Sequence, residues 1–100
     1  MSITEITQGM SERVARNGAI NGKVVTFDFG DDGAVRIDGK STPPVVDNDN
    51  GESDCRVKVA LSDFKDLAEG KQNAQMAFMM GKLKVEGDMG IAMQLSKILG

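Results

Sequence analysis

The hydrophobic pattern of this chain changes its period along the sequence, and this change limits the folds that the chain can adopt. Between residues 3 and 14, apolar residues recur at steps of three and four with polar residues between them, which is the pattern of an amphipathic helix. In the stretches 24–29, 35–37, 55–61 and 82–86, apolar and polar residues alternate instead, which is typical of half-buried strands. A chain with both periods needs a sheet with at least one helix packed on it.

Turn and capping residues separate these segments. The residues of the turn 30–33 tolerate positive φ, so this turn joins the first two strands as a hairpin. The segment 42–46 is expected to be a short third strand, and its two prolines favour an edge or irregular position.

Three further helices are expected after the fourth strand. The first begins with Ser62 as its N-cap and is closed by Gly70, the second spans residues 73–80, and the last runs from a cap at Asp88 to about Leu99. This order of elements predicts one α+β domain over residues 1–100, with helices gathered on one face of a mainly antiparallel sheet.

The composition excludes several classes of function. Lys and Arg number 12 against 15 Asp and Glu, and the four aromatic residues are all Phe, so a nucleic acid would find neither a basic field nor many stacking partners. The chain has no His and a single cysteine, Cys55, which removes the commonest general base and the usual metal ligands. We therefore expect no nucleic-acid partner, no metal, no cofactor and no catalytic residue, and a degenerate enzyme domain ranks last among the alternatives.

The acidic loop 47–52, with the sequence DNDNGE, has the composition of a calcium-binding loop but not its register. With Asp47 at position 1, glycine falls at position 5 and Lys58 at position 12, whereas an EF-hand loop needs glycine at 6 and glutamate at 12. A plain loop between strands is the better interpretation.

The N-terminal 18 residues carry charge from Glu5 onward and lack the apolar core of a secretory signal. No apolar run approaches the roughly 20 residues that span a bilayer. We therefore expect a cytoplasmic protein.

Residues 75–94 contain five of the seven methionines. Within them, residues 76–80 leave no polar face, and Met89 and Met93 lie outside the apolar stripe of the last predicted helix, which contains Ile91 and Leu95. One interpretation is that these methionines cover a neighbouring helix or terminus. The other is that this region borders an apolar ligand or partner, which the flexible thioether suits.

The same region resembles a known family. The residues that carry the resemblance are LSDF at 61–64, GK at 70–71, Ala74, AFMMGKLKVEGD at 77–88, Ala92 and Leu95, with weaker agreement in the hairpin 22–38. They are similar to the sterol carrier protein 2 (SCP2) family, of which this chain resembles a small, single-domain prokaryotic-type member. The resemblance implies a five-stranded sheet with helices over one face, an apolar tunnel between them, and binding of fatty acids, fatty acyl-CoA, phospholipids or sterols without chemistry. The chain departs from the family pattern in its short N-terminal helix and in its lack of tryptophan. A fatty-acyl ligand is favoured over a sterol.

The resemblance leads to two hypotheses. In the first, the chain binds or transfers an apolar lipid, makes transient membrane contact, and is a monomer or weak homodimer. In the second, the methionine-rich face is a protein–protein or homodimer surface that holds no ligand. Lys23, Lys82 and Lys84 are candidates for contact with a lipid head group, although alternating lysines usually face solvent. The residues expected to line the cavity or its mouth are Phe27, Phe64, Phe78, Met79, Met80, Leu83, Ile91 and Leu95.

Overall fold

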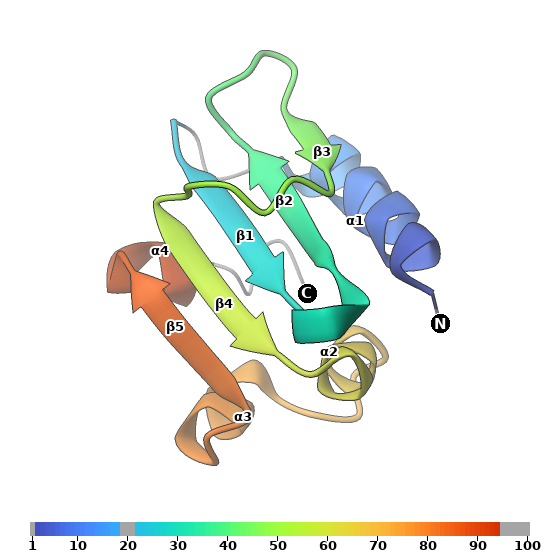
Figure 1. Ribbon diagram of the computed structural model, residues 1–100, viewed down its shortest axis with the longest axis vertical. Helices are drawn as coiled ribbons and strands as arrows, with labels where there is room; N and C mark the ends of the chain where they lie inside the picture. Colours follow the sequence, from blue (N-terminus) through green and yellow to red (C-terminus); the bar gives the residue numbers. More distant parts are fainter. Residues whose placement is uncertain (1, 19–21, 95–100) are drawn as a thin grey trace.

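The computed structural model describes residues 2–18 and 22–94, and these residues form one sheet covered by helices (Figure 1). The spatial order of the strands is β3-β2-β1-β4-β5. Of the four neighbouring pairs, three are antiparallel and the central pair, β1 with β4, is parallel, so the sheet is mixed. The strands are β1 (Val24–Asp28), β2 (Ala34–Asp38), β3 (Val45–Asp47), β4 (Cys55–Val59) and β5 (Leu83–Gly87).

The helices lie behind the sheet and at its lower end in Figure 1. They are α1 (Ile3–Asn17), α2 (Leu61–Ala68), α3 (Ala74–Met79) and α4 (Met89–Gln94). Helix α1 is held at its start by Ser2, whose Oγ accepts a hydrogen bond from the Glu5 N–H at 3.2 Å, which satisfies one of the free donors of the first turn. The helix predicted over 3–14 is therefore confirmed.

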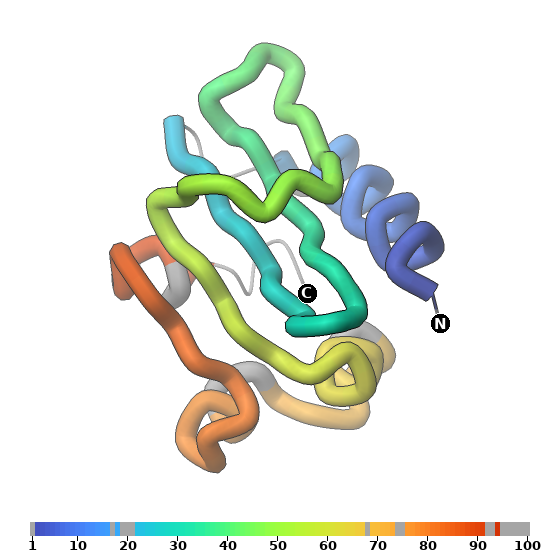
Figure 2. The backbone as a smooth tube through the Cα atoms, viewed as in Figure 1, coloured from blue at the N-terminus to red at the C-terminus, as the bar shows by residue number. Residues whose placement is uncertain are grey.

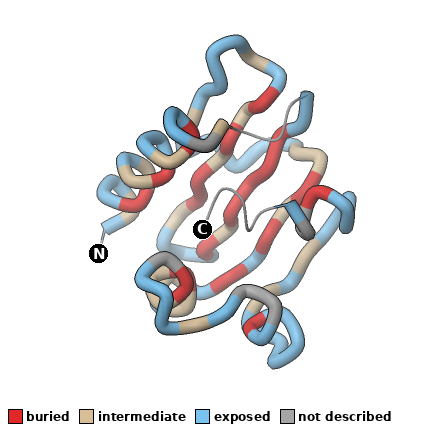
Figure 3. The backbone as a smooth tube through the Cα atoms, turned by 180° about the vertical axis from the view of Figure 1, so that it is seen from behind, coloured by how far each residue is buried: buried red, intermediate tan, exposed pale blue. Residues whose placement is uncertain are grey.

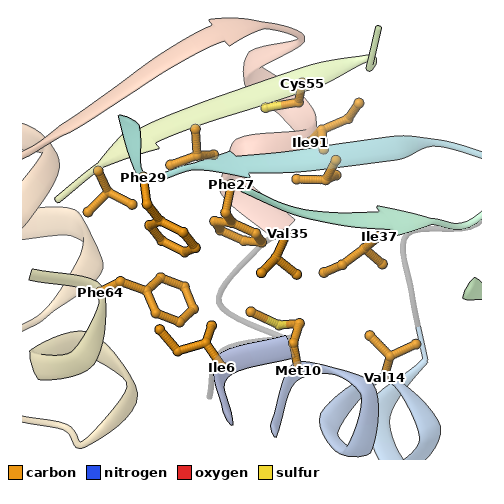
Figure 4. Close-up of a cluster of buried hydrophobic side chains, with 13 residues drawn as sticks. Ile6, Met10, Val14, Phe27, Phe29, Val35, Ile37, Cys55, Phe64 and Ile91 are labelled. Atoms are coloured by element: carbon orange, nitrogen blue, oxygen red, sulfur yellow. The ribbon is translucent and has the colours of Figure 1, made fainter. Parts of the chain in front are cut away.

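The core lies between the helices and the inner face of the sheet (Figure 4). Helix α1 contributes the apolar residues on the side that faces the sheet. Strands β1, β2 and β4 contribute every second residue, because alternate side chains of a strand point to the same face. Figure 3 shows the same arrangement as a buried band along the three central strands. The labelled members of this core are Ile6, Met10, Val14, Phe27, Phe29, Val35, Ile37, Cys55, Phe64 and Ile91.

Strand β1 is buried on both faces, whereas its alternation predicted burial on one face only. The segment 48–54 crosses in front of β2 and β1, as the path of the backbone tube shows in Figure 2. It is held there by paired hydrogen bonds: the Val24 N–H donates to Asp54 Oδ2 and the Asp54 N–H donates to the Val24 carbonyl, both at 2.8 Å. Thr26, on the outer face of β1, is completely buried, and strand register places it between Arg36 and Arg56.

Helix α2 and strand β3 differ in their bounds from the sequence-based expectation. Helix α2 begins at Leu61 with Ala60 at its N-cap, so the expectation that Ser62 would cap it was wrong, and Leu61 belongs to the helix rather than to the preceding strand. Strand β3 is at the edge of the sheet, as its prolines predicted, and spans only Val45–Asp47. Helix α4 is described as far as Gln94, and the rest of the helix predicted to Leu99 lies outside the described residues.

Candidate functional site

Four of the six exposed large hydrophobic residues in the described part of the chain lie at one corner of the molecule. At this corner α3 meets β5, at the lower end of the sheet in Figure 1. Helix α3 buries Ala77, which is 1% exposed. Three other apolar side chains of the helix face outward, with exposed fractions of 61% for Met76, 45% for Phe78 and 80% for Met79, and Met80 directly after the helix is 64% exposed. Exposed apolar side chains gathered on one short element are typical of a ligand, partner or membrane site.

The end of α3 is fixed by backbone hydrogen bonds. The Lys82 N–H donates to the Ala77 carbonyl at 2.9 Å and the Gly81 N–H donates to the Phe78 carbonyl at 3.1 Å. These two bonds form a Schellman motif, which requires the positive φ of 79° that Gly81 adopts. The motif holds the start of β5 directly against the apolar turn of α3.

Three of the residues predicted to line a cavity lie in the packed core instead of at an opening. Phe27 and Phe64 are 1% and 3% exposed, and their ring centroids are 5.4 Å apart in an edge-to-face arrangement. Phe64 makes a second such contact with Phe29 at 5.1 Å. Ile91 projects from α4 into the same cluster, near Cys55 (Figure 4).

The remaining predicted residues lie nearer the surface. Phe78, Met79 and Met80 are the exposed residues of α3 described above, and Leu83 is half-buried against the core cluster. Leu83 therefore lies between the exposed corner and the aromatic core. Leu95 lies outside the described residues.

A surface pocket of about 440 Å³ adjoins this corner, at the ends of β1 and β4 and the start of β5. None of the seven predicted residues that the structure describes lines it. Sequence reasoning singled out two of its lysines, Lys82 and Lys84, but missed the third, Lys58, which strand register places directly opposite Lys84. The residues around the pocket are Asp28, Phe29, Gly30, Lys58, Val59, Ala60, Gly81, Lys82 and Lys84.

The charges of the pocket are only partly compensated. Asp28 is engaged by Arg56, whose Nη1 lies 3.4 Å from Asp28 Oδ2, and Lys58 Nζ lies 3.4 Å from Glu86 Oε1. Among the residues that the structure describes, the ammonium groups of Lys82 and Lys84 have no ion pair or hydrogen bond. The pocket can therefore accept an anionic group.

The groups that catalysis or metal binding would use are placed differently. Cys55 is completely buried, and burial, with a smaller effect from Asp88, raises the pKa of its thiol. A buried neutral thiol is a poor nucleophile. Within residues 2–18 and 22–94 no three carboxylate or thiol groups gather as a metal site. In the acidic loop, Asp47 binds Arg36 through two hydrogen bonds of 3.2 Å, and Asp49 accepts the Gly51 N–H.

None of the described helices is long and apolar enough to cross a membrane. The molecule is a small α+β fold with a mixed five-stranded sheet, an aromatic and aliphatic core under helices on one face, and an exposed apolar corner beside a lysine-lined pocket.

The sequence profile of the SCP-2 sterol transfer family matches residues 4–100, so the chain belongs to that family. Sterol carrier protein 2 of Homo sapiens is 46% identical over 54 residues, which cover 54% of this chain and 10% of the human protein. The chain thus spans about a tenth of that relative's length. The non-specific lipid-transfer protein-like 1 of Caenorhabditis elegans is 35% identical over 102 residues, covering 94% of this chain and 86% of the relative.

Solved structures agree with the fold. The sterol carrier protein domain 2 of Helicoverpa armigera has a TM-score of 0.75 at 26% identity, covering 95% of this chain and 83% of that one. Palmitated SCP2L2 of Aedes aegypti has a TM-score of 0.65 at 23% identity, covering 99% of this chain and 95% of that one. The predicted α+β fold with five strands is confirmed by these similarities.

Proposed function

We propose that this chain, as a single domain over residues 1–100, binds and transfers an apolar lipid, with a fatty-acyl chain as the preferred ligand, and performs no chemistry on it. The observation that carries the proposal is the apolar surface of α3, where Met76, Phe78, Met79 and Met80 are 45–80% exposed. Elsewhere in the described chain, most large apolar side chains are packed in the core. Membership of the SCP-2 sterol transfer family and the palmitated state of the mosquito protein support a lipid as the molecule that contacts these exposed side chains.

The ligand would enter between the sheet and the helices at the corner of α3 and β5. Phe78, Met79 and Met80 would form the mouth, and Leu83, half-buried against the core, would lead inward. Phe27, Phe64 and Ile91 would form the inner wall, together with Leu95, through rearrangement of the packed aromatic cluster. Met suits such a mouth because its unbranched side chain adapts to different shapes.

Burial of an acyl chain supplies enough free energy for this role. Each methylene group removed from water contributes about 0.8 kcal/mol, so a long-chain fatty acid gains on the order of 10 kcal/mol. Association and side-chain ordering cost about 4 kcal/mol or more. The remaining free energy, at most about 6 kcal/mol, corresponds to a Kd on the order of tens of micromolar without any specific polar contact.

A substitution at the proposed mouth tests this function. Met80→Lys places a charge in the apolar mouth, so we expect it to weaken binding of a fluorescent fatty acid about tenfold or more while leaving the circular dichroism spectrum unchanged. Val45→Lys is the matched control, because Val45 is 45% exposed on the opposite edge strand β3. Equal binding by Met80→Lys and the wild type would contradict the role of Met80, and failure of the wild type to bind any fatty acid would contradict the function.

The exposed face of α3 also supports a second candidate function, a protein–protein or homodimer surface without a ligand. Sedimentation at several protein concentrations separates the two. A lipid carrier stays a monomer or weak homodimer, whereas the second function predicts a concentration-dependent dimer that contains no lipid.

A further inference from the structure

The exposed apolar side chains of the described chain are concentrated at one place. Six large hydrophobic residues are exposed, and four of them, Met76, Phe78, Met79 and Met80, lie on or directly after α3. The other two, Val45 and Met89, are on β3 and α4. One corner of the molecule therefore presents an apolar surface of its own.

The charge of the segment 70–85 is opposite to that of the whole chain, and the three carboxylates that the structure describes at this corner, those of Asp28, Glu69 and Glu86, are each in an ion pair. The net charge is −3, yet residues 70–85 contain three lysines and none of the 15 acidic residues. Lys71 is paired with Glu69 at 3.1 Å, whereas Lys82 and Lys84 are unpaired among the described residues. An anionic surface would thus repel most of the molecule and attract this corner.

The lysines lie next to the apolar side chains, because β5 packs against α3. The Schellman motif at the end of α3 fixes the backbone of Lys82, which follows Met80 by two residues in the sequence. Lys82 also lines the 440 Å³ pocket with Lys58 and Lys84. Apolar side chains flanked by lysines are the combination that binds the interface of an anionic membrane, where the apolar groups enter the acyl boundary and the cations meet the head groups.

We infer that this corner, consisting of α3 with Lys58, Lys82 and Lys84, docks on anionic phospholipid bilayers. Met76, Phe78, Met79 and Met80 enter the interfacial layer, and the lysine-lined pocket receives head-group phosphate. This inference rests on the proposed lipid-binding function, because docking here would bring the proposed mouth against the membrane that supplies the lipid. Docking would also account for the lysine-lined pocket, which would bind the head-group phosphate.

The test is cosedimentation of the protein with vesicles that contain no fatty acid. We expect binding to vesicles of phosphatidylcholine with phosphatidylglycerol, much weaker binding to phosphatidylcholine alone, and a loss of binding as salt is raised from 0.15 to about 0.5 M, because screening shortens the reach of the lysines. Absence of binding to the anionic vesicles would overturn the inference.

Two pairs of variants locate the surface. Lys82→Gln with Lys84→Gln should weaken partitioning roughly 10- to 30-fold. Its matched control, Arg16→Gln with Lys40→Gln, changes the net charge equally on α1 and in the loop after β2, and should have little effect. Met76→Gln with Met79→Gln should weaken partitioning about tenfold, and Val45→Thr should not. Equal partitioning of all four variants would overturn the inference, as would a homodimer that forms through α3 in place of vesicle binding.

Fatty-acid binding, measured without vesicles, separates this inference from the proposed function. A protein that binds fatty acid but not anionic vesicles would contradict the docking surface alone. A protein that binds vesicles but no fatty acid in solution would contradict the lipid-carrier function and leave the docking surface supported.

Discussion

The backbone of Gly87 passes so close to Asp54 that a Cβ atom on Gly87 would lie 2.4 Å from the Asp54 carbonyl oxygen. Gly87 also has a φ of 97°, which L side chains rarely adopt. The contact continues at Asp88, whose N–H donates to the same carbonyl at 3.1 Å. Since Asp54 also pairs with Val24, this contact connects the end of β5 to β1 and β4.

Gly87→Ala is therefore expected to lower the free energy of unfolding by about 3 kcal/mol, through backbone strain and the clash with Asp54. In a domain of this size the loss corresponds to a fall in Tm of more than about 10 °C. Gly81→Ala is the matched control, because Gly81 has a similar φ of 79° but no atom within 4 Å of its Cβ position. It should cost only about 1 kcal/mol. Equal thermal unfolding of the two variants would show that the Gly87 contact is unimportant.

The Thr26 hydroxyl is buried without a hydrogen-bond partner among the described residues. Thr26→Val replaces it with a methyl group of similar shape and removes an uncompensated polar group. We expect an increase of about 1 kcal/mol in the free energy of unfolding, measured by urea titration. The reverse change at the neighbouring buried position, Val25→Thr, should lower it by about 1–3 kcal/mol. A destabilised Thr26→Val variant would mean that the hydroxyl has a partner.

The burial of Cys55 is expected to make the free energy of unfolding depend on pH in the alkaline range. Because the pKa of its thiol is raised in the folded state, the folded protein binds this proton more tightly than the unfolded chain does. This contribution to stability is complete below the thiol's ordinary pKa of about 8.5 and is lost as the pH rises above it. Cys55→Ala should remove this alkaline loss from the unfolding curve.

A thiol reagent provides an independent check on Cys55. The native protein should react with a chromogenic disulfide far more slowly than the urea-unfolded protein at the same pH, because only the exposed thiolate reacts. Equal rates in the two states would contradict the burial of Cys55.

The sequence predicted those features of the fold that depend on local period and turn chemistry. The strands β1, β4 and β5 and the helix α1 follow directly from alternation and from steps of three and four. The parallel pairing of β1 with β4 and the burial of Thr26 could not be predicted in this way. The parallel pairing depends on the path of the segment 48–54 across the sheet (Figure 1), and Thr26 lies between Arg36 and Arg56 only through strand register. Neither feature has a periodic signal in the sequence.

The candidate site was predictable to a similar degree. The excess of methionine indicated an apolar surface on α3, and this surface is exposed in the structure. The pocket beside it was not predicted, because Lys58 and Lys84 are distant in sequence and meet only through the register of β4 and β5. The start of α2 could not be predicted from residue type alone. Ser62 is a favoured capping residue, but the turn after β4 places Ala60 at the N-cap position.

The most direct test of the lipid-carrier function is mass spectrometry of lipid extracted from the protein as purified, followed by fatty-acid titration of the stripped protein. The account predicts an apolar lipid that co-purifies at close to one molecule per chain and a fatty acid that rebinds with the same stoichiometry. A protein that carries no lipid and binds no fatty acid after stripping, while its circular dichroism spectrum shows it to be folded, would contradict the account.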